Sequence, residues 1–214
     1  MNRFFAVVAI ALSTLVGCGG DDNSPGSGNT GGNTGTTQQC SASNCTGCCF
    51  NNVCQTGTTA SACGKAGATC VACSSAQVCK TNQTCGVDPN SVWRVQPVSA
   101  RLTSNNNGSS WDGDGSAPDV FVLMQCPGAT TSTSTSEVES YNPTWTTGGC
   151  TARASQLMAE QWVFQLWDSD VSSNDTITDV RGFRFTEEHF TAGTLTFGAV
   201  GGMTSLTVQL QKQP

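Results

Sequence analysis

Ten cysteines lie within 46 residues, between Cys40 and Cys85. The large apolar residues of this segment are only four: Phe50, Val53, Val71 and Val78. So few apolar side chains cannot form a hydrophobic core, and a segment of this composition depends on cross-links for a defined structure. If the chain is exported, the even number of cysteines predicts five disulfides, whose pairing the sequence alone cannot choose.

A zinc site is the alternative for this segment. Cys45-x2-Cys48 and Cys70-x2-Cys73 are separated by 21 residues, which is close to the ligand spacing of a zinc ribbon. An adjacent cysteine pair and the many remaining cysteines favour disulfides, so we expect a disulfide-rich module over residues 40–86, acting as a spacer or a protein-binding element. The spacing also indicates an internal repeat with a shift of 25 residues: Cys45, Cys48 and Cys54 against Cys70, Cys73 and Cys79.

The N-terminus has the pattern of an export signal. An early positive charge precedes a largely apolar run of 13 residues, 4–16, which is too short to span a bilayer as a helix. Residues 15–18, LVGC, resemble the bacterial lipobox, which implies that residues 1–17 are a signal peptide and that Cys18 is the lipid attachment site. Gly19 implies an outer-membrane lipoprotein of the cell envelope, periplasmic or surface-exposed. A plain secretory signal with an unmodified Cys18 is the alternative.

Residues 18–39 connect this anchor to the cysteines. From residue 19 onward they contain no large apolar group, and such a segment buries too little surface to offset the entropy of ordering it. We expect a flexible Gly/Ser/Thr/Asn linker with an r.m.s. reach of roughly 25 Å. The cysteine-rich segment behind it resembles the short modules of predicted surface lipoproteins in myxobacteria.

All five tryptophans lie between Trp93 and Trp167, so the residues that build a core are separated from those that cross-link. From Trp93 onward, short runs of Val, Phe, Thr and Leu alternate with Gly, Asn, Asp and Ser, which is typical of an all-β sandwich. The expected strands are 92–103, 119–126, 137–141, 162–167, 180–185, 194–197 and 206–211. Residues 152–160 read as a helix, or as a strand followed by a turn. Trp162 and Trp167 have opposite parity, so they should face opposite sides of their strand.

The acidic residues of this region form two groups, one just before a strand and one just after a strand: Asp112, Asp114 and Asp119, then Asp168, Asp170 and Asp175. Six neighbouring carboxylates would raise one another's pKa values by repulsion unless a cation neutralises them. Calcium accepts six to eight oxygen ligands in flexible geometry, whereas magnesium requires a stricter octahedron. The pattern therefore predicts calcium as the cofactor. A solvated acidic face is the alternative.

Residues 92–212 resemble the C2 domain, an eight-stranded antiparallel β-sandwich that binds calcium and phospholipid. Four segments carry the resemblance in the family's order: Asp119-Val120-Phe121-Val122, Asn142-Pro143-Thr144-Trp145, Leu166-Trp167-Asp168-Ser169-Asp170 and Asp175-Thr176-Ile177. The resemblance implies a C2-like sandwich over residues 90–214, with calcium ligands at Asp119, Asp168, Asp170 and Asp175. Asp112 or Asp114 would supply the ligand of the first loop.

The loop tips depart from those of C2 domains that enter membranes. They read Gly113, Gly115, Ser172 and Ser173, without bulky apolar or basic residues. An ion-filled carboxylate rim could instead bridge to a sugar, a phosphate or an acidic protein surface.

Three function hypotheses remain. The first is a lipid-anchored envelope protein whose calcium loops engage a surface protein, glycan or phospholipid, in addition to the membrane contact of its lipid. The second is a structural or adhesive component without a specific ion, and the third is a carbohydrate-binding sandwich with exposed tryptophans. The net charge of −6 disfavours nucleic acid as a partner.

Two further expectations concern single residues. Cys126 and Cys150 should form a disulfide that closes the loop between them. His189 is the only histidine, and the chain has no HExxH or GxSxG motif, so we expect that it is not an enzyme.

Overall fold

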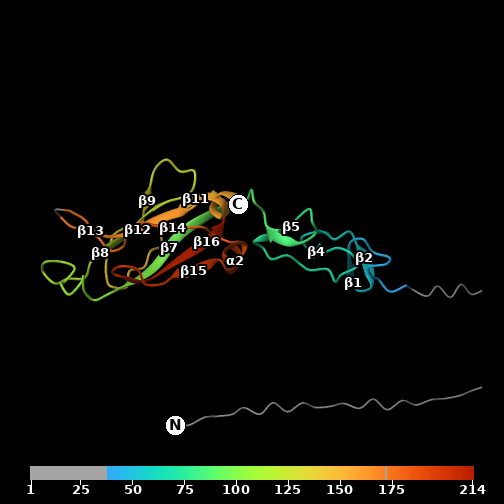
Figure 1. The fold of residues 1–214 in the computed structure, drawn as a ribbon, viewed down its shortest axis with the longest axis horizontal. Helices are drawn as coiled ribbons and strands as arrows, with labels where there is room; N and C mark the ends of the chain where they lie inside the picture. The colour runs from blue at the N-terminus through green and yellow to red at the C-terminus, as the bar shows by residue number, and fades with distance from the viewer. Residues whose placement is uncertain (1–37, 172) are drawn as a thin grey trace, which may run out of the picture. The chain divides into compact units, whose positions relative to one another are not determined.

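The computed structural model describes residues 38–171 and 173–214. The expected signal peptide, the lipid attachment site at Cys18 and the linker as far as residue 37 lie outside the described residues, as does Ser172. Short hairpins come first along the described chain, and a two-sheet β-structure follows them (Figure 1). In the described part of the chain, no helix has the length and apolar character needed to cross a membrane.

The cysteine-rich segment folds into three small antiparallel hairpins. They are β1 (Cys48–Phe50) with β2 (Val53–Gln55), β3 (Thr58–Thr59) with β4 (Ala62–Cys63), and β5 (Gln77–Cys79) with β6 (Cys85–Val87). Strands of two or three residues present little surface for packing, so disulfides must stabilise this segment.

All ten cysteines between Cys40 and Cys85 are paired in disulfides, which confirms the expected number of five. The pairs are Cys40–Cys49, Cys45–Cys54, Cys48–Cys70, Cys63–Cys79 and Cys73–Cys85. Because every sulfur is in a disulfide, none is free as a thiolate for zinc, and the zinc alternative is wrong.

The disulfides define an internal repeat, but not the one indicated by the cysteine spacing. Cys49 and Cys54 are cross-strand partners in the first hairpin, and each is bonded to a cysteine that precedes the hairpin. Cys79 and Cys85 have the same relation in the hairpin of β5 and β6. The predicted 25-residue shift is therefore wrong, because it makes Cys48 equivalent to Cys73. Cys48 is bonded to Cys70 and links the first hairpin to the chain before the last one, whereas Cys73 is bonded to Cys85 in the hairpin of β5 and β6.

Two antiparallel sheets form the rest of the chain (Figure 1). The first has the order β11 (Cys150–Arg153), β7 (Val92–Leu102), β16 (Met203–Lys212), β15 (Thr194–Phe197). In the second, β8 (Asp119–Gln125) pairs with β12 (Trp162–Asp168) at the centre. Short edge strands flank this pair: β9 (Thr133–Ser134) and β10 (Val138–Glu139) on β8, and β13 (Asp175–Thr176) and β14 (Arg181–Phe183) on β12.

Each edge of the second sheet is thus one interrupted strand, and both sheets are four strands wide. This arrangement confirms the expected eight-stranded antiparallel sandwich. A disulfide joins Cys126, just after β8, to Cys150 at the start of β11, and so links the two sheets. On the chain-entropy model, closing a loop of 24 residues stabilises the fold by roughly 3 kcal/mol.

Two short helices lie within the described residues. Helix α1 (Ala154–Ala159) follows β11 directly, so both alternatives for residues 152–160 hold in part: a strand comes first and then a helix. Helix α2 (Glu187–Ala192) is not predicted by the sequence pattern, because it is too short to show a helical period. His189 has a local structural role here, because its Nδ1 accepts a hydrogen bond of 2.9 Å from the backbone N–H of Thr186 at the start of α2.

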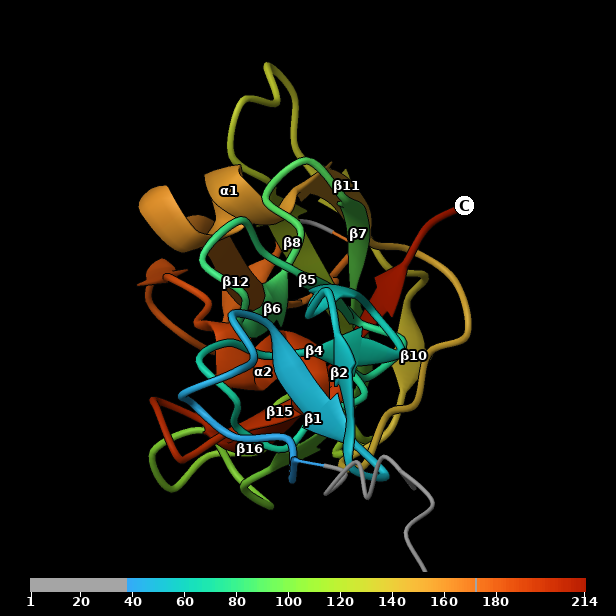
Figure 2. The ribbon, with the colours of Figure 1, turned by 90° about the vertical axis from the view of Figure 1, so that its right-hand side faces the viewer.

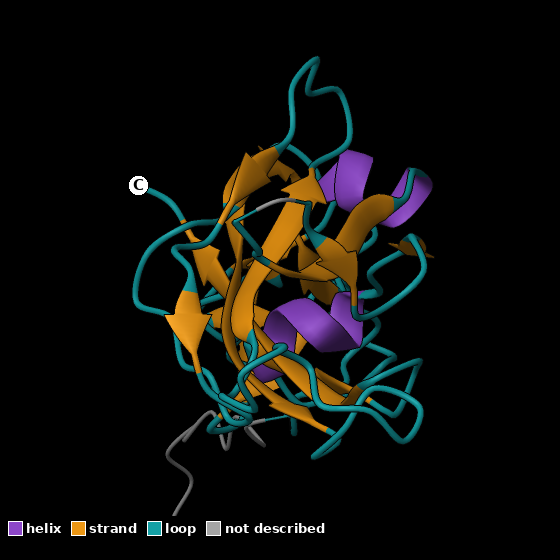
Figure 3. Ribbon diagram, turned by 90° about the vertical axis from the view of Figure 1, so that its left-hand side faces the viewer, coloured by secondary structure: helices purple, strands orange, loops and turns teal. Residues whose placement is uncertain are grey.

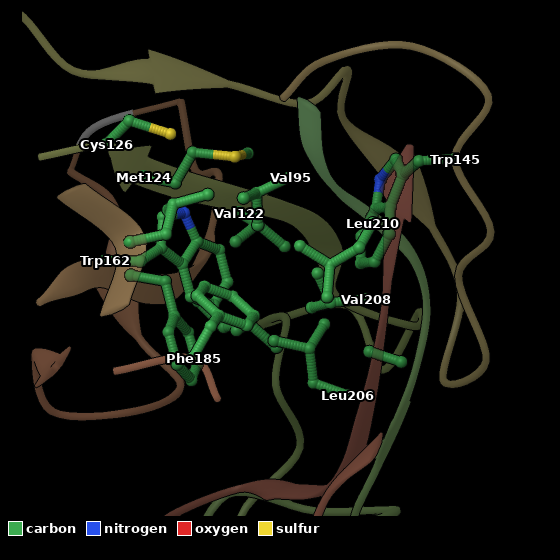
Figure 4. Close-up of a cluster of buried hydrophobic side chains, with 14 of the residues drawn as sticks. Val95, Val122, Met124, Cys126, Trp145, Trp162, Phe185, Leu206, Val208 and Leu210 are labelled. Atoms are coloured by element: carbon green, nitrogen blue, oxygen red, sulfur yellow. The ribbon is translucent and has the colours of Figure 1, made fainter. Parts of the chain in front are cut away.

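The core lies between the sheets, where alternate residues of the central strands point inward (Figure 4). Trp162, Phe164 and Leu166 of β12 are buried, whereas Trp167 is half-buried on the opposite face. The predicted opposite parity of Trp162 and Trp167 is confirmed. Trp93, Trp111 and Trp145 are also buried, so the exposed-tryptophan hypothesis retains only Trp167 as a candidate sugar platform.

Candidate metal centre

The acidic loops project from one end of the sandwich (Figure 1), which faces the viewer in Figure 3. Residues 103–118 connect β7 to β8, and residues 169–174 follow β12. Asp168, the last residue of β12, lies between Val120 of β8 and Asp175 of β13 in the strand register. Strand pairing therefore brings together carboxylates that are about 50 residues apart in sequence.

Asp168 is the buried member of this group. Its exposed fraction is 0%, because it occupies an inward-facing position of β12. Its Oδ1 accepts a hydrogen bond of 2.7 Å from the backbone N–H of Asp119, and the Ser169 N–H donates to the Asp119 carbonyl at 2.9 Å. Its Oδ2 is also buried, and it has no hydrogen-bond partner among the described residues. A buried carboxylate oxygen without a partner is energetically unfavourable.

Burial raises the pKa of Asp168 to about 6, and the hydrogen bond from the Asp119 N–H opposes the increase. The negative charges of Asp112, Asp170 and Asp119 also raise this pKa. Burial, the charge of Asp175 and the nearby Asp112 carboxyl raise the pKa of Asp170. Five carboxylates therefore interact electrostatically, and their mutual repulsion favours the binding of a proton or a cation.

Asp114 has a different environment. Its Oδ1 accepts hydrogen bonds from the Ser116 backbone N–H at 3.0 Å and from the Ser116 hydroxyl at 2.7 Å, and these bonds lower its pKa. Asp112 Oδ2 also lies 3.1 Å from the same hydroxyl. Of the two first-loop carboxylates, Asp112 is the one whose charge raises the pKa values of both Asp168 and Asp170.

The carboxylates surround Asp168 without forming a compact cage. Across residues 38–171 and 173–214, the groups of three candidate ligand atoms within 4.8 Å of one another are formed by cysteines: Cys40, Cys45 and Cys54, and Cys63, Cys73 and Cys85. Both groups consist of neighbouring disulfides. The acidic residues fit a hard cation through oxygen ligands on loops, and the ion would have to draw these ligands together.

Trp111 supports this site in a way that the sequence pattern did not predict. The ring is buried, and its Nε1 donates a hydrogen bond of 3.0 Å to the Thr103 carbonyl, which fastens the loop before Asp112 to the end of β7. Gly202 lies against the ring, since a Cβ at that position would be 2.5 Å from a ring carbon. A tryptophan directly beside an acidic loop was the available signal.

A polar pocket of about 360 Å³ lies beside this loop anchor. Its lining comes from three segments: Thr103 with Asn105–Asn107, Thr176–Asp179, and Gly201–Gly202. Thr176 directly follows Asp175, so the pocket adjoins the acidic group.

No family model matches the chain, and no curated protein sequence matches it. Among solved structures, the chain is similar to a C2 domain, with 16% identity, 58% of this chain and 99% of that chain covered, and a TM-score of 0.41. It is similar to a C2 domain of plant extended synaptotagmin 1 at 13% identity, 59% and 98% coverage and a TM-score of 0.40. The calcium-bound pair of C2 domains of extended synaptotagmin 2 matches at 16% identity, 58% and 47% coverage and a TM-score of 0.41.

Proposed function

We propose that the sandwich binds calcium at its acidic loops and that the bound ion mediates contact with a partner. The observation that supports this most directly is the buried, unpartnered Oδ2 of Asp168. Around it lie Asp112, Asp119, Asp170 and Asp175, whose charges would repel one another without a cation. A divalent ion would give the buried oxygen a partner and would neutralise its neighbours.

Calcium suits these residues better than magnesium. The ligands would come from a strand end and from two loops, with remaining positions taken by backbone carbonyls and water. Calcium tolerates such variable geometry, whereas magnesium requires an almost ideal octahedron and retains most of its water. In the calcium form, the rim would present an ion with open coordination positions to a phosphate, a carboxylate or a sugar hydroxyl.

The calcium proposal is tested by thermal unfolding of the oxidised protein in EDTA, in magnesium and in calcium. A ligand that binds only the folded state stabilises it by about 2.7 kcal/mol at a concentration of 100 times its Kd. We expect stabilisation by calcium, and its loss in Asp168→Asn and Asp170→Asn. Asp179→Asn, in the loop after β13, is the matched control and should keep it. Coincident curves for the wild-type protein would instead favour a structural sandwich without an ion.

We further propose that the protein is a lipoprotein of the cell envelope, held there through acyl chains on Cys18. The supporting observation is the LVGC sequence at residues 15–18 behind an apolar segment. Mass spectrometry of the mature N-terminus should find a diacylated cysteine. Cys18→Ser should move the protein from the detergent phase to the aqueous phase in a detergent partition. An unmodified N-terminus would show a plain secretory signal.

The partner class is tested with calcium present and absent. Vesicles with acidic phospholipid, a glycan array and envelope extracts represent the three candidate partners. Binding that requires both calcium and Asp168 would identify the partner class. Binding that is unchanged in EDTA would show that the partner is recognised without the ion.

A further inference from the structure

The cysteine-rich segment exposes most of its apolar side chains. Phe50, Val53 and Val71 each have an exposed fraction of 57%. Elsewhere in the described chain, the large exposed apolar residues are three valines on the sandwich: Val92, Val171 and Val180. Because disulfides rather than a core hold the module together, Phe50 and Val53 are free to serve in an external contact.

Phe50 and Val53 form a rigid tip on the hairpin of β1 and β2, which Figure 2 shows facing the viewer. They are cross-strand partners, and between them Asn51 and Asn52 have φ values of 48° and 64°, which is typical of a tight two-residue hairpin turn. The next pair, Cys49 and Cys54, is fixed by two disulfides. A tip held in this way loses little conformational entropy when it binds.

The stretch of sequence that carries this tip is uncharged. Residues 40–64 contain no Asp, Glu, Lys, Arg or His. The tip can therefore leave water without removing a charge from solvent, which would be unfavourable in an apolar medium. An uncharged surface with exposed Phe and Val side chains suits the boundary between lipid headgroups and acyl chains.

The tip also lies where the chain from the expected lipid anchor reaches the module. The backbone N–H of Cys40 donates a hydrogen bond of 2.7 Å to Oδ1 of Asn52, in the turn itself. Cys18 precedes Cys40 by 22 residues, which corresponds to an r.m.s. reach of roughly 25 Å for a flexible linker. A short tether makes the contact intramolecular, so even a weak interaction becomes populated.

From these observations we infer that the tip formed by Phe50–Val53 docks shallowly into the bilayer in which Cys18 is anchored. This inference rests on the proposed lipid anchor. Docking would orient the module against the membrane instead of leaving it free at the end of the linker. The acidic loops of the sandwich have no part in this contact, so it does not require calcium.

The test uses the lipidated full chain in phosphatidylcholine vesicles with bromine atoms near the headgroup end of the acyl chains. Phe50→Trp adds a fluorophore at the tip, and Val180→Trp is the matched control at a sandwich position that is 62% exposed. After subtraction of the wild-type emission, brominated lipid should quench the added tryptophan of the first variant by about half, at the shallow depth of an interfacial contact. The control should show no quenching. Equal emission of Phe50→Trp in brominated and ordinary lipid would overturn the inference.

A second arm separates this inference from the lipid anchor. The chain with Cys18→Ser and a histidine tag in place of residues 1–17 is held on nickel-chelating lipid, and the same quenching is expected there. Phe50→Ser/Val53→Ser should stay on these vesicles but lose protection from hydrogen exchange at residues 49–54. If the wild-type protein proves not to be acylated at Cys18 but quenching occurs in this arm, the tip contact is retained and only the anchor is rejected. If residues 49–54 are protected only when another protein is added, the tip binds protein and not lipid.

Discussion

At the scale of single residues, Asp168 stands out as a buried carboxylate at the edge of the sandwich core. The two-residue alternation of β12 points Trp162, Phe164 and Leu166 into the core, and the next inward position is a carboxylate. One oxygen is satisfied by the Asp119 N–H, and the other has no partner within the described residues. A buried charge with incomplete partners destabilises the folded state, so the ion-free sandwich carries a local energetic penalty.

Asp168→Asn should therefore have opposite effects with and without calcium. The amide keeps an acceptor for the Asp119 N–H but removes the charge. Because the pKa of Asp168 is raised from 3.8 to about 6, and one pKa unit equals about 1.4 kcal/mol, the ion-free variant should be more stable by up to about 3 kcal/mol at pH 7. Urea unfolding in EDTA measures this difference. A variant less stable than the wild type in both conditions would contradict the assigned role of the carboxylate.

The pH dependence of the ion-free protein has a defined sign. A carboxyl whose pKa is higher in the folded state binds its proton more tightly there, so its contribution is largest below the unfolded value. It is lost as the pH rises through the folded value. In EDTA, the free energy of unfolding should fall between about pH 4 and pH 6, and Asp168→Asn should reduce this fall. A wild-type stability that rises across this window relative to the variant would show that the raised pKa is wrong.

At the scale of elements, the start of β16 supports the acidic loop through Trp111. Gly202, just before β16, leaves room for the indole, which in turn hydrogen-bonds the end of β7 at Thr103. The loop carrying Asp112 is therefore positioned by contacts outside the loop itself. Strand β16 also pairs with β7 along nearly its whole length, and these two strands form the centre of the first sheet.

Gly202→Ala should destabilise the sandwich by about 1–3 kcal/mol, because the added Cβ would lie 2.5 Å from a ring carbon of Trp111 and the ring would have to shift. Gly113→Ala is the matched control, since no atom lies within 4 Å of its Cβ position and its φ is not positive. Thermal unfolding in EDTA compares the two. Equal stability of both variants would mean that the loop adapts without the indole contact.

At the scale of the whole molecule, different forces stabilise the two ends of the described chain. The hairpins as far as β6 depend on five disulfides, whereas the sandwich has a continuous core and one disulfide. The two meet where Val87 of β6 joins the core cluster and where Lys80 forms an ion pair with Glu187 of α2. An ion pair of partly exposed side chains adds at most about 1 kcal/mol, so Val87 is the stronger connection.

Reduction should therefore unfold the module before the sandwich. With thiols free, trypsin should cut rapidly at Lys65 and Lys80, while Arg94 and Arg101 in β7 stay protected by the sheet. Mass spectrometry of the fragments over time, in calcium and with and without reductant, measures this order. Loss of the sandwich fragment at the same rate as the module would contradict the conclusion that disulfides stabilise the module and the hydrophobic core stabilises the sandwich.

Several features of this protein follow from local sequence, because alternation and composition are properties of neighbouring residues. The strands around Val120 and Trp162, the opposite faces of Trp162 and Trp167, and the dependence of residues 40–85 on disulfides are all of this kind. The all-β sandwich follows from the succession of such strands. Helix α2 does not follow from local sequence, because six residues are too few to show the period of a helix.

Only the tertiary structure decides which cysteines pair and which carboxylate is buried. The 25-residue spacing suggested one correspondence between the cysteines of the two repeats, and the hairpins show a different one. The pairing of cysteines depends on which strands fold back against each other. Likewise, Asp112 and Asp114 are equivalent in sequence, but Asp114 accepts two hydrogen bonds from Ser116, whereas the charge of Asp112 acts on Asp168. Local spacing does not encode how segments about 50 residues apart approach each other; strand register and core packing determine it.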